Sequence, residues 1–188
     1  MMMTKFKVFD DFISPTYQNI LQAIFLAENT RWSYQEHMNY GNSGLSQFYI
    51  SIFDERMIEH VELYHSLLGL VSKIKDDIVP EFNPIRIRGI LQTSINNPPK
   101  HYIPHIDSPT NDWSFIYYIN DDATGDTYLF DRTIANVSNG NENNYKWNHV
   151  DSVSPKKGRL IMFPSKQYHA GSPPDTGKRM LINFNYSK

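Results

Sequence analysis

Hydrophobic positions recur at helical spacing in two segments of the first 80 residues. In the first segment, Ser14 is a candidate N-cap followed by a first-turn proline, and apolar residues then recur up to Asn29. The second segment follows Asp54 as a candidate N-cap and ends before Pro80. Its expected apolar stripe comprises Met57, Val61, Tyr64, Leu68, Val71 and Ile78. The pattern therefore predicts two helices in an N-terminal part of about residues 10–80.

The rest of the chain has the pattern of short strands. Residues 31–53 are aromatic and polar around a centre rich in Gly and Asn, which predicts two strands joined by a long loop. From residue 84 onward, short apolar runs alternate with turn residues. Strands are expected near 85–95, 102–106, 113–120, 126–131, 149–153, 159–163, 167–170 and 179–186. Residues 155–158 are expected to form a hairpin turn in which Gly158 takes a positive φ.

These elements predict a mainly β protein of the α+β class. Eight short strands over about residues 84–186 are typical of a double-stranded β-helix, or jelly roll, with the two helices packed against it. The sequence has no internal repeat and no sharp change of composition, so residues 1–188 are expected to form a single domain. We expect this domain to act as a monomer or a homodimer.

Composition and charge exclude several classes of function. The chain has 18 Lys and Arg against 20 Asp and Glu, so its charge attracts neither nucleic acid nor an anionic membrane. It has no cysteine, so any metal must be held by histidines and carboxylates. The N-terminal residues lack the apolar run of a signal peptide, and no later run has transmembrane length. A cytoplasmic location is therefore expected.

Two His-x-Asp triplets could contribute to a metal site. They are His105 with Asp107 and His149 with Asp151. On an extended strand, residues i and i+2 point to the same face, so either triplet offers one imidazole and one carboxylate to a cation. His169 lies 64 residues after the first triplet, far enough for the chain to cross a sandwich and return. It lies only 20 residues after His149, and Asp151 leads directly into the predicted turn. We therefore favour the first triplet.

Two histidines and one carboxylate leave coordination positions open, as in non-haem Fe(II) oxygenases, although zinc could use the same ligands. Arg179 helps to separate these possibilities because it lies on a predicted strand whose alternate residues face the interior. A buried guanidinium requires an anionic partner, and a dicarboxylate co-substrate bound to the metal would supply one. The alternative is a surface arginine that pairs with Asp175.

At this point several motifs resemble those of a known family. The segments, in chain order, are Tyr102-Ile103-Pro104-His105-Ile106-Asp107, Ile116-Tyr117-Tyr118-Ile119-Asn120, Gly125-Asp126-Thr127-Tyr128-Leu129-Phe130 and Pro155-x-x-Gly158-Arg159-Leu160-Ile161-x-Phe163. Over most of residues 30–186 the chain resembles the Fe(II)/2-oxoglutarate-dependent dioxygenases, and within them the prolyl-hydroxylase-like branch. Asp126 departs from the family pattern, which has a second glycine there.

The resemblance implies a site and a reaction. It implies Fe(II) ligands at His105, Asp107 and His169. It also implies that Arg179 and Tyr118 bind the distal carboxylate of 2-oxoglutarate, with Tyr102 and Asn183 as further cofactor contacts. The enzyme would consume O₂ and 2-oxoglutarate, hydroxylate its substrate, and release succinate and CO₂, with ascorbate as a candidate reductant.

The substrate is less closely defined. The resemblance favours a prolyl residue in a peptide or protein, with a free amino acid or another small molecule as the alternative. Residues 37–47 and 132–148 are candidate walls of the substrate site. A zinc-dependent hydrolase and a non-catalytic jelly-roll binding module remain alternatives from other functional classes.

Overall fold

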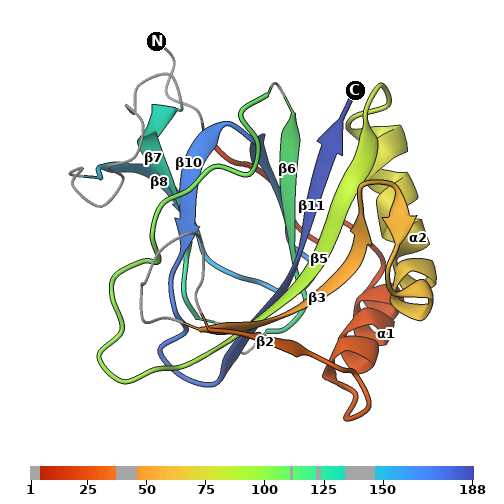
Figure 1. Ribbon diagram of the computed structural model, residues 1–188, viewed down its shortest axis with the longest axis horizontal. Coiled ribbons are helices and arrows are strands. Elements are labelled where there is room, and N and C mark those ends of the chain that lie inside the picture. The colour runs from red at the N-terminus through yellow and green to blue at the C-terminus, as the bar shows by residue number, and fades with distance from the viewer. Residues whose placement is uncertain (1–4, 37–45, 111, 122–123, 134–146) are drawn as a thin grey trace.

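The computed structural model describes residues 5–36, 46–110, 112–121, 124–133 and 147–188, and two antiparallel sheets dominate it (Figure 1). The strands are β1 (Lys7–Phe9), β2 (Ser33–Gln35), β3 (Gln47–Asp54), β4 (Met57–Ile58), β5 (Asn83–Thr93), β6 (Trp113–Tyr118), β7 (Thr127–Thr133), β8 (His149–Val153), β9 (Leu160–Pro164), β10 (Gln167–Gly171) and β11 (Lys178–Ser187). The larger sheet has the order β1-β9-β6-β11-β5-β3-β2, with β4 paired to β3, and the smaller has the order β10-β7-β8. The predicted jelly-roll core of a mainly β protein is confirmed.

Two helices, α1 (Pro15–Leu26) and α2 (Val61–Asp77), cover the outer face of the larger sheet (Figure 1). Helix α1 begins as predicted, because the Ser14 side chain accepts a hydrogen bond from the backbone N–H of Tyr17. Its buried apolar side chains are Leu21 and Phe25. No helix of the described residues is both long enough and apolar enough to cross a bilayer.

The predicted start of the second helix is wrong. Its predicted buried face is correct for Val71, and Tyr64 and Ile78 are partly buried against the core. Asp54 ends β3 instead of capping a helix, because Glu55 and Arg56 take φ values of 47° and 70° and turn the chain back into β4. Met57 lies on β4 and is 66% exposed, and His60 is the N-cap. The side chains that α2 buries are Leu63, Leu67, Leu70, Val71 and Ile74.

Alternation along the larger sheet separates two apolar layers. On β11, the even-numbered residues from Met180 to Tyr186 pack with the helices in one core cluster. The odd positions Arg179, Leu181 and Asn183 line a cavity between the two sheets. The sheet therefore supports the helices with one face and builds a cavity with the other.

Seven of the eight strands predicted after residue 84 are present, and residues 102–106 are the exception. This segment makes an isolated bridge, in which the backbones of His105 and His169 exchange two hydrogen bonds of 3.0 and 2.9 Å. The backbone N–H of Tyr102 also donates to the carbonyl of Gly171 at 2.8 Å. Pro104 has no backbone N–H, so it cannot donate a hydrogen bond that would extend this bridge into a longer strand pairing. The segment nevertheless places His105 opposite His169.

The turn at residues 155–158 has the predicted positive φ at Gly158, 79°, but it does not close a hairpin. Strand β8 pairs with β7 in the smaller sheet, whereas β9 pairs with β6 and β1 in the larger one. The turn therefore carries the chain from one sheet to the other. The strands β2 and β3 within residues 31–53 are confirmed. Residues 37–45 and 134–146, which form most of the two candidate substrate walls, lie outside the described residues.

Candidate metal centre

The isolated bridge between His105 and His169 of β10 brings three predicted ligands together. His105 and His169 lie on its two sides, and Asp107 is anchored by a 2.9 Å hydrogen bond from its backbone N–H to the carbonyl of Ser165. Nε2 of His105 is 4.0 Å from Oδ1 of Asp107, and Nε2 of His169 is 3.8 Å from Oδ2. Among the described residues, this is the one group of metal-ligating side chains whose ligand atoms all lie within 4.8 Å of one another.

Both histidines are oriented as metal ligands. Nδ1 of His169 is 3.1 Å from the carbonyl oxygen of Gln167, and Nδ1 of His105 is 3.4 Å from that of Ile103. A carbonyl oxygen is an acceptor, so the Nδ1 atom that contacts it must carry a proton. Each neutral ring is therefore protonated on Nδ1, and its Nε2 lone pair is free to bind a metal beside Asp107. Two imidazole nitrogens and one carboxylate suit Fe(II) with open coordination positions. The residues therefore fit the metal that the sequence suggested.

The protonation states also favour cation binding. Desolvation by the surrounding protein, with a contribution from His169, lowers the pKa of His105 to about 4, so its ring is neutral at pH 7. Burial by itself would raise the pKa of Asp107. The two histidines, Arg86 and a hydrogen bond from Ser114 outweigh that effect and lower the pKa well below its usual range. The centre thus presents a neutral imidazole and an ionised carboxylate.

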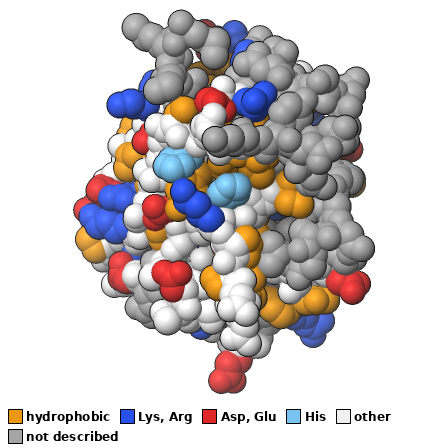
Figure 2. Space-filling model, turned by 90° about the vertical axis from the view of Figure 1, so that its left-hand side faces the viewer, with side chains coloured by type: hydrophobic (Ala, Val, Ile, Leu, Met, Phe, Trp, Pro, Cys, Tyr) orange, Lys and Arg blue, Asp and Glu red, His pale blue; other side chains and the backbone are white. Residues whose placement is uncertain are grey.

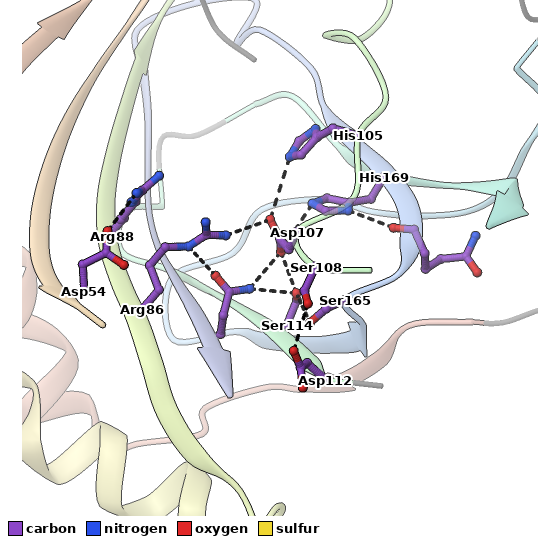
Figure 3. A network of polar contacts seen from close by, with 12 residues as sticks. Asp54, Arg86, Arg88, His105, Asp107, Ser108, Asp112, Ser114, Ser165 and His169 are labelled. Atoms are coloured by element: carbon purple, nitrogen blue, oxygen red, sulfur yellow. Dashed lines mark hydrogen bonds and ion pairs between the residues drawn. The ribbon is translucent and has the colours of Figure 1, made fainter. Parts of the chain in front are cut away.

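A polar network holds the Asp107 carboxylate in place (Figure 3). Its Oδ2 accepts hydrogen bonds from Ser114 at 2.5 Å and from Asn185 at 3.1 Å. Arg86 lies 3.5 Å from Oδ1 and also donates from Nε to the Asn185 side chain at 2.8 Å. Sequence reasoning missed Arg86, Ser114 and Asn185. Alternation along β11 puts Asn185 on the same face as Arg179, but it does not show which residues lie opposite.

Arg179 lies in the same cavity, with its side chain buried and only 2% of the residue exposed. Its Nη1 donates to Gln92 at 2.8 Å and its Nη2 to Thr127 at 2.6 Å, and both partners are neutral. Nε has no hydrogen-bond partner among the described residues. A Cβ added at Gly171 would lie 3.0 Å from Nη1, so that glycine leaves room for the guanidinium. The alternative of a surface arginine paired with Asp175 is therefore wrong.

The remaining predicted site residues lie close to Arg179. Tyr102 and Asn183 line the cavity, and burial raises the pKa of Tyr102 to about 12, which keeps its hydroxyl protonated as a donor. The Tyr118 hydroxyl is 2.7 Å from Oγ1 of Thr127, and its ring centroid is 5.5 Å from Cζ of Arg179. Sequence reasoning missed Gln92 and Thr127, which hold the guanidinium and line the cavity.

The second His-x-Asp triplet lies elsewhere. His149 is exposed at the start of β8, with its ring centroid 5.5 Å from that of Tyr128. The Asp151 carboxylate accepts a 2.9 Å hydrogen bond from the backbone N–H of Phe6. This carboxylate therefore has a structural role in securing the N-terminal segment.

Comparisons with known proteins agree with this geometry. The sequence model described as the 2OG-Fe(II) oxygenase superfamily matches residues 91–187. A search of curated protein sequences gives no match.

Several solved structures share the fold at low sequence identity. A prolyl hydroxylase from Trichoplax adhaerens, in complex with a hypoxia inducible factor peptide fragment, is 20% identical, with a TM-score of 0.59 over 96% of this chain and 82% of its own. The non-heme alpha ketoglutarate dependent epimerase SnoN from nogalamycin biosynthesis is 10% identical, with a TM-score of 0.68 over 99% of this chain and 78% of its own. HygX from Streptomyces hygroscopicus, with nickel and 2-oxoglutarate bound, is 11% identical, with a TM-score of 0.63 over 98% of this chain and 83% of its own.

Proposed function

Because the chain belongs to the 2OG-Fe(II) oxygenase superfamily, we propose that it hydroxylates a C–H bond of an organic substrate at this centre. His105, Asp107 and His169 hold Fe(II), and Arg179 binds the distal carboxylate of 2-oxoglutarate. One oxygen atom of O₂ enters the substrate as a hydroxyl group, and the other enters succinate as 2-oxoglutarate loses CO₂. The chain belongs to an oxygenase family, and its three candidate metal ligands are all present. Both facts argue against a zinc hydrolase and against a binding module without catalysis.

The observation that carries this proposal is the uncompensated charge of Arg179 beside the triad. Fe(II) with Asp107 has a formal charge of +1, and the buried guanidinium adds another positive charge. A dianion such as 2-oxoglutarate neutralises both, with one carboxylate on the metal and the other on Arg179.

The protein's own residues position and protect the reactants. When bound, Fe(II) and 2-oxoglutarate would supply the electrons that activate O₂, which is the oxidant. Gln92 and Thr127 fix the guanidinium of Arg179, so the co-substrate enters in one orientation. The apolar side chains of Ile116 and Leu181 line the same cavity as Arg179 and the two histidines, where they help to exclude water. Tyr118 bonds to Thr127 and is the candidate second donor to the distal carboxylate.

A prolyl residue in a peptide or protein is the proposed substrate, supported by the Tyr-x-x-His-x-Asp and Tyr-Tyr motifs and by the fold shared with the Trichoplax prolyl hydroxylase. A free amino acid or another small molecule is the alternative, because the fold is equally shared with the epimerase SnoN. The single domain over residues 1–188, its cytoplasmic location, its assembly as a monomer or homodimer and the use of ascorbate stay predictions.

The test is an anaerobic titration of the apo-protein with Fe(II) and then 2-oxoglutarate. Chelation of the metal by the co-substrate is expected to produce a visible metal-to-ligand charge-transfer band, which the His169→Ala variant should lack. A wild-type protein that binds Fe(II) but gives no band would contradict the proposal. Prolyl peptides and free amino acids can then be compared by mass spectrometry for the addition of one oxygen atom.

A further inference from the structure

Two arginines on β5 lie at the edge of the metal cavity. Arg86 and Arg88 alternate with the buried Ile87, so they share a face with Ile90 and Gln92, which line that cavity. Figure 3 shows Arg86 and Arg88 side by side on this strand, with Arg86 nearer to Asp107. Their side chains are 26% and 39% exposed. A molecule entering the cavity along β5 would meet both guanidinium groups.

Two buried polar atoms without hydrogen-bond partners belong to the paired residues Arg88 and Asn183. Asn183 lies directly opposite Arg88 on β11, and its Oδ1 has no partner among the described residues. Nε of Arg88 also lacks a partner among those residues. Asn183 lines the metal cavity. Buried polar groups are almost always hydrogen-bonded, so a free donor and a free acceptor on paired residues indicate a missing polar partner.

The charges around the cavity leave an excess of positive charge. Within the described residues, Asp54 at 3.1 Å is the acidic partner of Arg88, while Arg86 shares Asp107 with the proposed Fe(II). With Fe(II) and 2-oxoglutarate bound, the charges of the metal, the co-substrate, Asp54, Asp107 and the three arginines sum to +1. A substrate carboxylate placed against the guanidinium of Arg88 would compensate this charge locally.

Resting on the function proposed above, we propose that Arg88 and Asn183 recognise a substrate that carries a carboxylate together with a neighbouring N–H donor. The carboxylate accepts from the Arg88 guanidinium, including its free Nε, and the N–H group donates to the free Oδ1 of Asn183. A peptide with an acidic residue next to the hydroxylated one has both groups, and so does an α-amino acid, whose ammonium group supplies the N–H. The carboxylate is common to both substrates, and the experiment below distinguishes them.

The face in Figure 2 agrees with a charged substrate. It shows basic side chains between two histidine side chains, with hydrophobic side chains next to them. Such a surface combines electrostatic attraction of an anion with apolar contacts for the rest of a small substrate. A neutral peptide can accept hydrogen bonds from the basic groups but forms no ion pair with them.

The test compares matched probes that differ only in charge. One pair is L-proline and L-prolinamide, and the other is acetyl-Ala-Pro-Glu-amide and acetyl-Ala-Pro-Gln-amide. Each is added anaerobically to protein loaded with Fe(II) and 2-oxoglutarate, and its Kd is read from the change in the visible charge-transfer band. We expect the carboxylate member of one pair to bind at least tenfold more tightly than its amide. The pair that shows this preference identifies the source of the carboxylate.

Three variants assign the preference to Arg88. Arg88→Gln should abolish it while the Kd for 2-oxoglutarate stays within twofold of wild type, and Arg31→Gln, an exposed arginine, should retain it. Asp54→Asn frees Arg88 from its acidic partner and should tighten carboxylate binding severalfold. Unchanged melting temperatures would show that the variants fold.

The outcomes separate this inference from the function on which it rests. Absence of the charge-transfer band in wild type would refute the proposed function itself. With the band present, the substrate inference is overturned if neither carboxylate probe binds, if both pairs bind without regard to charge, or if Arg88→Gln keeps the preference.

Discussion

Arg179 and Gln92 face each other across the ladder between β11 and β5, and Nη1 of the arginine donates to Oε1 of the glutamine at 2.8 Å. This neutral partner holds the guanidinium in place without neutralising it. A carboxylate at the position of Gln92 would have satisfied the same donor and removed the charge on which co-substrate binding depends. The glutamine thus keeps a buried cation both oriented and available.

Replacement of Arg179 by alanine should weaken the binding of 2-oxoglutarate by about 3–5 kcal/mol, because it breaks a buried ion pair. Arg179→Lys should recover part of this loss, since it keeps the charge without the planar pair of donors. Titration of the charge-transfer band gives both affinities, and Fe(II) affinity measured without co-substrate is the control. An unchanged Kd for 2-oxoglutarate in the alanine variant would exclude Arg179 as its partner.

His169→Ala should abolish tight Fe(II) binding while the fold is kept, because it removes one of three ligands and leaves the strand pairing of β10 intact. His149→Ala is the matched control, because this residue is exposed on β8 and belongs to the triplet outside the centre. Fe(II) binding can be measured by competition with a chromogenic chelator, and folding by circular dichroism. Loss of Fe(II) binding in His149→Ala would mean that the wrong triplet was chosen.

Asn185→Ala should lower Fe(II) affinity by about 10- to 100-fold, the usual effect of removing a hydrogen-bond partner of a metal ligand. The reason is that Asn185 donates to the Asp107 carboxylate and also accepts from Arg86. Asn183→Ala changes the same residue type on the same face of β11 without touching the carboxylate. Calorimetric titration of the two apo-proteins with Fe(II) should therefore differ, and equal affinities would show that the network does not position Asp107.

Gly125→Ala should destabilise the fold more than Gly177→Ala. Both glycines have positive φ, 91° and 67°, so both variants carry the strain of about 1–2 kcal/mol that a side chain causes there. An alanine Cβ at Gly125 would also lie 2.7 Å from the backbone oxygen of Ser172, whereas no atom lies within 4 Å at Gly177. Urea unfolding under identical conditions measures the difference, and equal losses would contradict the backbone clash.

The metal ligands could be predicted because their geometry is local or follows the order of motifs along the chain. In an extended segment His105 and Asp107 share a face whatever surrounds them. His169 followed from its spacing and Arg179 from its predicted strand, and the resemblance agreed with both. The partners of these residues could not be predicted. Gln92 and Asn185 contact Arg179 and Asp107 across strands, and a shift of one residue in register would point either side chain to the opposite face.

The error in α2 has a related cause. Its sequence carries two apolar stripes one position apart, one with Tyr64 and Leu68 and the other with Leu63 and Leu67. Spacing alone fits both, and the position of the sheet decides which stripe is buried. At residues 102–106, the apolar pattern predicted a strand. The pattern does not show which strand this segment would pair with, and Pro104 limits that pairing.

The alternation of β11 also bears on how relatives of this protein diverge. Even-numbered residues from Met180 to Tyr186 carry the packing against the helices, while odd-numbered residues from Arg179 to Asn185 carry binding. Selection can therefore change an odd-numbered residue such as Asn183 without altering the packing against the helices. An insertion or deletion of a single residue would exchange the two sets at once. The length of β11 is thus under stronger constraint than the identity of the side chains that point into the cavity.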